Sequence, residues 1–561
     1  MKYSATSRLG EGVEMSKQLS QQTGRSYSSS YGLVEGSDPF CYRDLGLSLK
    51  SKIKLFCKVN LFMVTLQEAP LVLAIITFIG KHKPINDLFP HLQDVLERIC
   101  VQFISQGTTK QAKQAVKCLY VNVTANQDRV FSLILDVIKD KLNGDKDKIT
   151  LTVIVALGHL AFHLPEKFPI QVKNLVSKKI VKDLMMKDVT PDRGDGTSWC
   201  CFDDLCLETQ CKVEGMKMIA RWLLSLRTDE GAAQKTFKLL HAVLETGGDL
   251  LEEGKPNLAE RAWLRLSAGC AILKICEQKV LRDKMTLEQY YTLSNLMTDP
   301  VLQVREKFLV KLHKGLGRAA PLQCLPLDFM AMYVLAGLES DNRLRGLAKQ
   351  FLVTDIKTLI QSGCMNNASV HQPLVMPENM LRFAVLLLTH YPGFTLQSIK
   401  HALVFILDPL IHNENYSFCI YRELIQKMKH HRDAHKGDID QVDFRLWAVC
   451  DLAMGILITR TTNLGRKKFL SEIPPMYSKA MDDPKLRDIK SYLPSELQHS
   501  TLRKTTTPAM GTPMDSLLYS VSVPLGSSVE VEDCEPGTFI VGVEDGGSVE
   551  TGSGRKKPRR K

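Results

Sequence analysis

The chain has 561 residues, of which 44% are hydrophobic and 7% aromatic, and its formal net charge is +12. This hydrophobic fraction excludes a chain that is disordered throughout, and it suffices for several cores or for the continuous core of a repeat protein. The last seven residues, RKKPRRK, supply six of the positive charges, and the +6 of the rest (12 minus 6) argues against a solenoid that grips nucleic acid along its full length.

Local composition predicts an all-α fold. Leu, Ile, Val, Ala and Met recur in runs flanked by Lys and Glu, which favours helices over sheets. The fifteen cysteines are scattered and odd in number, as in reduced intracellular proteins rather than secreted disulfide frameworks. The most apolar stretch, Ala69–Gly80, is shorter than the roughly 20 residues of a membrane-spanning helix. We therefore expect no membrane segment.

Four segments follow one another along the chain. Residues 1–50 are rich in Ser, Gly and Gln, lack the apolar core of a signal peptide and are predicted to be disordered. Residues 51–460 alternate amphipathic segments with short breaks, which predicts helices in pairs. Residues 461–500 are expected to form a terminal helix and an extension that carries YLPSEL. Residues 501–561 are predicted to be a disordered tail with a basic end.

Two lysine stripes follow predicted helices on the side away from their apolar residues. In a helical repeat protein the second helix of each pair lines the concave surface, so these stripes would face a bound acidic peptide. The alternative is a solvated helix face without a partner. The lysines are Lys110, Lys113, Lys117, Lys307, Lys311 and Lys314.

The stretch CCFDDLCLETQC is the first candidate metal site. It brings Cys200, Cys201, Cys206 and Cys211 close together, but adjacent cysteines and four-residue gaps suit a tetrahedral zinc ion poorly. We interpret it as a cysteine-rich loop between helices.

The stretch KHHRDAHKGDID is the second candidate. A polar loop between helices is the preferred interpretation, because no second ligand cluster can be placed beside it. Its potential ligands are His430, His431, Asp433, His435 and Asp438.

Catalytic motifs are not found. GGDLLEEGKPN resembles a phosphate-binding loop only superficially, since Pro256 stands where Ser or Thr would bind magnesium. Serine-hydrolase, zinc-protease and kinase signatures do not occur. We therefore expect no catalytic, cofactor-binding or metal-binding residue, and no enzyme.

An internal repeat determines the expected architecture. Leu264-Arg265, Val304-Arg305 and Leu344-Arg345 are spaced by forty residues. A period near 40 with one helix pair per unit matches a HEAT/armadillo-type α-solenoid. Two further triplets keep the same spacing: Ala268, Phe308 and Ala348, and Ile272, Leu312 and Leu352.

The repeated arginine lies within an apolar stripe, where an unpaired guanidinium would be costly. Asp299 and Pro300 are predicted to be the N-cap and first residue of the helix that carries Arg305. Arg305 is expected to reach the capping acid of a neighbouring repeat, so that Asp299, Arg265, Arg305 and Arg345 form a structural ladder. Glu339 holds the capping position of the third unit.

The basic C-terminus is the remaining candidate site. It fits a short nuclear-import signal or a weak contact with DNA phosphates, and a solvated tail is the alternative. Its charged residues are Arg555, Lys556, Lys557, Arg559, Arg560 and Lys561.

Several blocks together resemble a known family. KQAKQAVKCL, VALGHLAFHLPEKF, RLSAGCAILKICEQ, LEQYYTLSNLMTDPVLQVREKFLVKLHKGL and YLPSEL are similar, in family order from about Lys110 to Leu497, to the cohesin-associated family named for precocious dissociation of sisters. Members of that family are usually much longer. This chain resembles the later part of their HEAT-repeat spine.

The resemblance implies a scaffold without enzymatic activity or cofactor. It would bind the kleisin subunit of the cohesin ring, act with cohesin release and protection factors, and work on nuclear chromatin in sister-chromatid cohesion and mitosis. A HEAT-type nuclear transport receptor or coat adaptor that binds peptide motifs is the alternative. An enzyme with a cryptic metal centre is a third.

Overall fold

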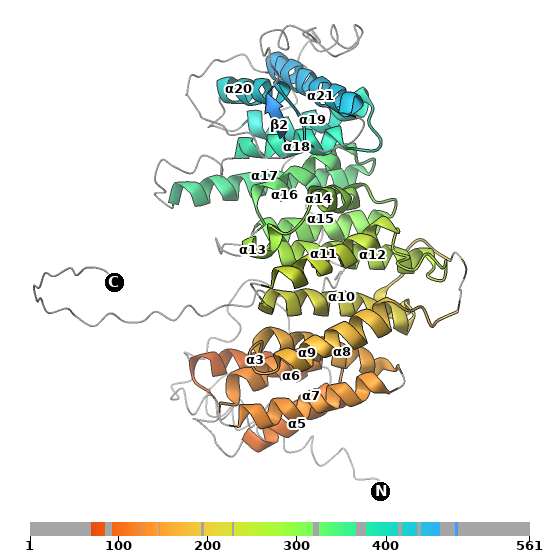
Figure 1. The fold of residues 1–561 in the computed structure, drawn as a ribbon. Helices are drawn as coiled ribbons and strands as arrows, with labels where there is room; N and C mark the ends of the chain where they lie inside the picture. Colours follow the sequence, from red (N-terminus) through yellow and green to blue (C-terminus); the bar gives the residue numbers. More distant parts are fainter. Residues whose placement is uncertain are drawn as a thin grey trace, which may run out of the picture. The chain divides into compact units, whose positions relative to one another are not determined.

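The computed structural model describes residues 69–84, 93–124, 126–144, 146–191, 194, 196–226, 229–317, 325–365, 377–412, 418–434, 439–460 and 477–480, without side chains at 362–365, 439–440 and 477–480. They belong to one structural unit of the chain, Met1–Arg503. They are helical almost throughout, which confirms the all-α prediction (Figure 1). None of the helices in these ranges is both long and apolar enough to span a membrane. The predicted disordered segments, residues 1–50 and 501–561, lie outside the described residues.

One row of helices runs through the described chain, and each member contacts the next. Its members are α3 (Ala69–His82), α6 (Thr109–Asn122), α8 (Lys148–His163), α10 (Leu207–Leu226), α12 (Leu258–Cys276), α15 (Leu302–Leu316) and α17 (Asn342–Met365).

A second row packs against the first, one partner for each helix from α6 to α17. Several of its members end in a π-helical or 3₁₀ segment. It consists of α5 (Gln93–Gln106), α7 (Gln127–Asn143), α9 (Pro169–Asn174) with η3 (Leu175–Met185), α11 (Glu230–Glu245), α14 (Leu287–Ser294) with η5 (Asn295–Thr298), and α16 (Leu327–Met330) with η6 (Ala331–Leu338).

The remaining elements follow α17 or lie in the connections. Helix pairs that stack in two rows are the arrangement of HEAT repeats, as the forty-residue period predicts. These elements are η4 (Phe202–Asp204), α13 (Lys279–Arg282), η8 (Pro377–Asn379), α18 (Met380–Thr389), α19 (Leu396–Ile411), α20 (Phe418–Lys429) and α21 (Ile439–Arg460).

One short ribbon departs from the helical prediction. Strand β1 (His431–Asp433) pairs antiparallel with β2 (Tyr477–Ala480). The sequence predicts a polar loop at the first segment and a terminal helix with an extension around the second. The loop prediction is wrong for His431–Asp433, because pairing with a segment distant in the chain fixes these residues as a strand. The prediction for residues 461–500 stays a prediction, since Tyr477–Ala480 are the described residues of that range.

The repeat register predicted from the sequence is correct. Leu264, Val304 and Leu344 are 4%, 0% and 3% exposed and belong to one continuous apolar core. The equivalent residues of the other two triplets are buried in that same core. Successive helix pairs therefore share an interior, rather than each enclosing its own.

Helix α10 joins this core to a second one formed by the earlier helices. Met218 and Trp222 face the core that begins on α3, whereas Met216 and Leu223 face the core that extends to α21. A helix that is apolar on two sides is typical of an element buried between neighbours. The position of α10 therefore depends on both sets of repeats.

The repeated arginines bridge successive helix pairs. Arg265 Nε and NH2 donate to the two carboxylate oxygens of Asp299 at 2.7 and 3.0 Å. Arg305 donates in the same way to Glu339, at 2.6 and 3.0 Å. Its NH1 also donates to the carbonyl of Asp299 at 2.6 Å, so Arg305 joins two helix starts. The predicted contact with the acid of the next repeat is present.

Two details of the predicted ladder are wrong. Helix α15 begins at Leu302 with Val301 as its N-cap, so Asp299 and Pro300 precede the helix; Asp299 accepts the Val301 N–H at 2.9 Å instead of capping the first turn. Arg345 donates to the Glu339 carbonyl at 3.1 Å, and none of its described partners is a carboxylate. The two bridges span 34 residues, and the residue at that distance from Arg345 is the uncharged Asn379.

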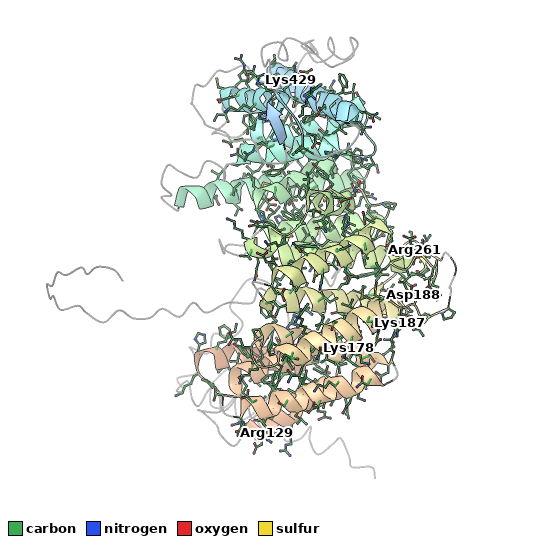
Figure 2. All side chains as sticks on the ribbon, in the orientation of Figure 1. Arg129, Lys178, Lys187, Asp188, Arg261 and Lys429 are labelled. Carbon is green, nitrogen blue, oxygen red and sulfur yellow. The ribbon has the colours of Figure 1, made fainter. Side chains whose placement is uncertain are left out.

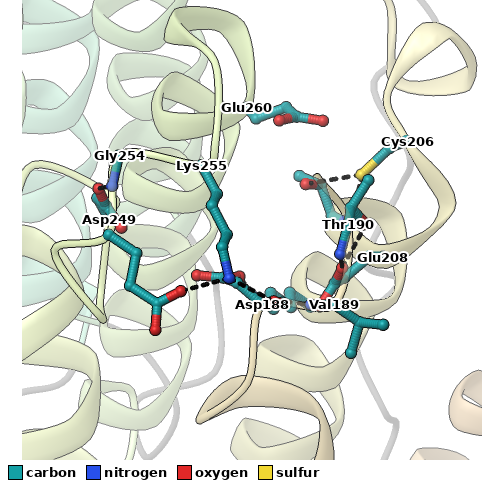
Figure 3. A network of polar contacts seen from close by, with 12 residues as sticks. Asp188, Val189, Thr190, Cys206, Glu208, Asp249, Gly254, Lys255 and Glu260 are labelled. Atoms are coloured by element: carbon teal, nitrogen blue, oxygen red, sulfur yellow. Dashed lines mark hydrogen bonds and ion pairs between the residues drawn. The ribbon is translucent and has the colours of Figure 1, made fainter. Parts of the chain in front are cut away.

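Earlier helices are joined at a similar edge by a different network (Figure 3). Glu208, at the start of α10, accepts the N–H groups of Val189 and Thr190 at 3.1 and 2.8 Å, and Lys212 forms an ion pair with Asp188. Burial raises the pKa of Glu208, but these hydrogen bonds and Lys212 outweigh burial and lower it overall.

The next connection joins this network. Lys255 Nζ donates to the Asp188 carbonyl at 3.0 Å, and Arg261 NH2 lies 3.3 Å from Asp249 Oδ2. Figure 2 shows Asp188 and Arg261 at the same edge of the helices. Together with the two arginine bridges, these contacts tie the starts of α10, α12 and α15 to neighbouring connections.

Replacing Arg305 with methionine should destabilise the chain by about 3 kcal/mol, because the buried Glu339 carboxylate would lose its cation. Arg345→Met is the matched control. Arg345 is exposed and pairs with no described carboxylate, so its loss should cost less than about 1 kcal/mol. Urea unfolding followed by far-ultraviolet circular dichroism measures both. Equal destabilisation would contradict the bridging role.

The contact between Arg305 and Glu339 also predicts that stability depends on pH. Burial raises the pKa of Glu339, but hydrogen bonds from Arg305 and from the Asp341 N–H outweigh it and hold the pKa below its ordinary 4.5. A carboxyl group with a lowered pKa stabilises the folded state at pH values above its ordinary pKa. This contribution is lost as the pH falls through the pKa of the group in the folded state. The difference between wild type and Arg305→Met should therefore shrink below pH 4.5. A difference that persists into strong acid would argue against the ion pair.

Gly337 marks a close approach between η6 and α19. A Cβ at this position would lie 2.7 Å from Ala402 Cα and 2.8 Å from Phe405 Cβ. Gly337→Ala should therefore destabilise the chain by about 1–3 kcal/mol through overpacking. Gly346→Ala on α17, with no atom within 4 Å of the new Cβ, should stabilise it by about 0.5–1 kcal/mol through helix propensity. Effects of the same sign in thermal unfolding would contradict this packing.

Candidate functional site

The first lysine stripe lies on α6, as predicted. Lys110 is exposed, whereas Lys113 and Lys117 are partly buried against neighbouring helices. The apolar residues of α6 face the core on the other side: Ala112, Ala115, Val116 and Leu119 are all fully buried.

The second stripe lies on α15, and one of its lysines is already engaged. Lys307 Nζ lies 5.8 Å from the ring centroid of Trp199 and 5.5 Å from that of Trp263. Lys311 and Lys314 follow one and two turns later, partly buried and exposed respectively. Lys307 therefore contributes a cation–π contact, in addition to charge.

The two tryptophans were not predicted to be site residues. Trp199 stacks on Trp263 with ring centroids 4.7 Å apart, and Phe202 meets Trp263 edge-on at 5.5 Å. Trp263 Nε1 donates to the Cys200 carbonyl at 3.0 Å, which fixes the loop before α10 against α12. A tryptophan beside paired cysteines was the available sequence signal, but nothing in the sequence placed it near α15.

Helix α10 connects the two stripes. Lys217 lies 5.7 Å from the Phe202 ring centroid and forms an ion pair with Glu214 at 2.6 Å. One turn later, Arg221 lies against α8, where a Cβ on Gly158 would be 3.3 Å from Arg221 NH1. Gly158 thus makes room for the guanidinium.

Two histidines of α8 lie beside Arg221. The rings of His159 and His163 are nearly parallel with centroids 6.3 Å apart, and Tyr120 of α6 stacks on His163 at 4.8 Å. Burial, and then the charge of Lys117, lower the pKa of His163 to about 4. Burial and the charge of Arg221 lower the pKa of His159 well below its ordinary 6.5. Both imidazoles are therefore neutral at physiological pH.

These contacts form two groups, one at α6, α8 and α10 and one around Trp263, and α10 carries members of both. We call the two groups together the basic face. Cations lie beside aromatic rings in both groups, an arrangement that suits an acidic peptide with apolar side chains between its charges. Its members are Lys113, Lys117, Tyr120, His163, Lys217, Arg221, Phe202, Trp199, Trp263, Lys307 and Lys311.

The cysteine-rich stretch has a structural role in the described chain. Cys206 caps α10, since its sulfur accepts the Thr209 N–H at 3.2 Å. Burial raises the pKa of Cys211 to about 12, which disfavours the thiolate that zinc requires. Cys200 and Cys201 lie in the loop that carries Trp199. The residues that the structure describes contain no group of three or more metal-ligand side chains in binding geometry.

The structure describes the side chains of residues 429–434 of the histidine-rich stretch. His431 Nδ1 lies 2.7 Å from the Lys427 carbonyl, and Asp433 pairs with His390. His435 and Asp438 fall outside the described residues. The C-terminal basic cluster, Arg555, Lys556, Lys557, Arg559, Arg560 and Lys561, also falls outside them.

Comparison with known proteins gives relatives that share most of this chain. Sister chromatid cohesion protein PDS5 homolog B-B of Xenopus laevis is 31% identical over 425 residues, which are 74% of this chain and 29% of that protein. Human PDS5 homolog B is 30% identical over the same shares. Human PDS5 homolog A is 29% identical over 84% of this chain and 35% of that protein. The chain thus spans about a third of the length of these relatives.

The family model described as sister chromatid cohesion protein PDS5 protein matches residues 49–471. The match contains every described helix from α3 to α21. Because it covers well over half of the sequence, the chain belongs to the PDS5 family of sister chromatid cohesion proteins.

Proposed function

We propose that this protein is a non-catalytic scaffold of the cohesin complex, acting in sister-chromatid cohesion by holding an acidic segment of the kleisin subunit on the basic face. Membership of the PDS5 family supports the cohesion role. The observation that carries the binding mode is the placement of cations beside aromatic rings on helices between α6 and α15.

The basic face suits a peptide because its groups are held in place before binding. Trp199, Trp263 and Phe202 are fixed by stacking and by the Trp263 hydrogen bond to Cys200. Preorganised aromatic groups lose little conformational entropy when a partner binds. Lysines around them attract acidic side chains and speed association.

The expected setting is the nucleus, where the protein reaches chromatin through cohesin. Release and protection factors of cohesin are the further partners that the family resemblance implies. The basic C-terminal cluster, Arg555 to Lys561, would serve nuclear import or a weak contact with DNA phosphates. No membrane association forms part of this proposal.

Charge reversal tests the basic face. Lys311→Glu with Lys314→Glu should weaken binding of a purified kleisin segment by about tenfold, because two attractive charges become repulsive. The matched control is Lys235→Glu with Lys238→Glu on α11, which changes the net charge equally at two exposed positions of the other row. Fluorescence anisotropy measures both affinities.

The result separates three cases. Loss of affinity in the α15 variant alone supports the basic face. Equal losses would mean that net charge, and no particular surface, drives binding. Failure of the wild-type chain to co-elute with the kleisin at micromolar concentration would overturn the proposed function itself.

Nuclear fractionation distinguishes the scaffold from a transport or coat adaptor. We expect the protein in the chromatin pellet and its release, together with cohesin, after nuclease treatment. An adaptor would instead remain in the soluble fraction before digestion. Soluble recovery from nuclei without nuclease would favour the adaptor.

A further inference from the structure

The junction of α6, α8 and α10 contains buried polar atoms without partners. His159 Nε2, His163 Nε2 and Arg221 NH1 are inaccessible to solvent and accept or donate no hydrogen bond within the part of the chain that the structure describes. His159 is only 7% exposed. A buried polar group without a partner destabilises the folded state, so hydrogen-bonding capacity remains unused at this junction.

The charges around these atoms are positive. Lys81 of α3 and Lys113 and Lys117 of α6 act on the two imidazoles, as does Arg221 of α10. An anion placed beside His163 would be attracted by these cations.

The other helices packed against α8 do not supply that anion. Helices α5 and α7 carry the ion pair of Glu97 with Arg129, whose Oε2 and NH2 atoms lie 3.4 Å apart, and α9 contributes Lys173. Among the described residues, no carboxylate contacts Arg221 or His163.

Arg221 differs from the other arginines of its row. Arg265 and Arg305 each hold a buried carboxylate in a two-point contact. Arg221 lies over Gly158 without such a partner, and it is only partly buried, as is His163. A carboxylate from outside could therefore pair with Arg221 as Asp299 pairs with Arg265.

We propose that the junction of α6, α8 and α10 anchors one aspartate or glutamate side chain of the acidic peptide on the basic face, against Arg221 and His163, with uptake of a proton. The imidazole of His163 takes this proton from the solvent and becomes an imidazolium, whose N–H donates to the incoming carboxylate. The inference rests on the proposed peptide-binding function and specifies its anchor. Tyr120 and Lys117 flank the anchor and receive the neighbouring peptide residues.

Proton uptake follows from the electrostatics of the free protein. The pKa of His163, about 4 without ligand, rises once a carboxylate lies beside the ring, because the negative charge stabilises the imidazolium. Affinity should therefore increase as the pH falls from about 7.5 to about 6, a range in which glutamate and aspartate stay ionised. Calorimetry in buffers of different ionisation enthalpy should detect proton uptake at the lower pH.

Two variants test the anchor in the full chain, with the kleisin segment and a synthetic glutamate-rich peptide as probes. Arg221→Gln should weaken both by about tenfold or more, the size expected of a charge-assisted hydrogen bond. Arg221 has no hydrogen-bond partner in the described chain, so the Arg221→Gln variant should fold as the wild type does. His163→Phe keeps the ring that stacks on Tyr120 but should abolish proton uptake and the pH dependence.

Arg129→Gln on α7 is the matched control, since it removes the same charge from a side chain that is 74% exposed (Figure 2). It should leave affinity unchanged. If the Arg221→Gln variant binds both probes with the same affinity as the Arg129→Gln variant, the anchor is overturned. It is also overturned if the affinity of the His163→Phe variant still depends on pH.

The outcomes separate this inference from the proposed function. If the kleisin binds with an affinity that does not depend on Arg221 or His163, the anchor is overturned and the proposed function stands. If the kleisin does not bind but the glutamate-rich peptide does so through Arg221, the proposed function fails and the anchor remains. Displacement of the peptide by inorganic phosphate beyond the effect of chloride at equal ionic strength would overturn the carboxylate assignment in favour of a phosphate site.

Discussion

The arrangement of the repeats depends on a two-point contact between an arginine of one helix pair and an acid at the start of the next. Removing both charges from water costs several kcal/mol, and the short, paired hydrogen bonds of Arg305 with Glu339 offset that cost. What the contact adds is geometry. Apolar side chains would tolerate a helix shifted by a turn, whereas a planar guanidinium accepts its carboxylate in few orientations. The bridges thus set the register in which the apolar triplets of successive repeats meet.

Fixing that register also determines the basic face. Helix α10 contributes to the cores on both sides and carries Lys217 and Arg221 on its remaining surface. Any rotation of α10 would separate Lys217 from Phe202 and Arg221 from Gly158. The stability of the stack and the shape of the candidate binding surface are therefore properties of the same helix.

The positively charged and titratable groups of the basic face are stabilised in different ways. Lys307 is stabilised by the stacked tryptophans, and Lys217 by Glu214 and Phe202. His159 and His163 avoid repulsion by remaining neutral, at the cost of unpaired nitrogens. At this junction the buried nitrogens of His159 and His163 stay unsatisfied next to Arg221, which contacts no carboxylate of the described chain, so the junction differs from the structural bridges.

The sequence by itself determined the helical class, the forty-residue period and the reach of Arg305 to an acid of the next repeat, because periodic burial and the cost of an unpaired guanidinium are both local properties of a helix. Even there, the start of α15 was misplaced, since Asp299 bonds the chain before the helix and also receives Arg265 from a residue 34 positions earlier. Only the tertiary structure brought Trp199 to Lys307 and Arg221 to His159. The sequence alone singled out neither the histidines of VALGHLAFH nor Arg221 as site residues. Their meeting depends on how α8 and α10 pack, a relation between faces that no spacing along the chain encodes.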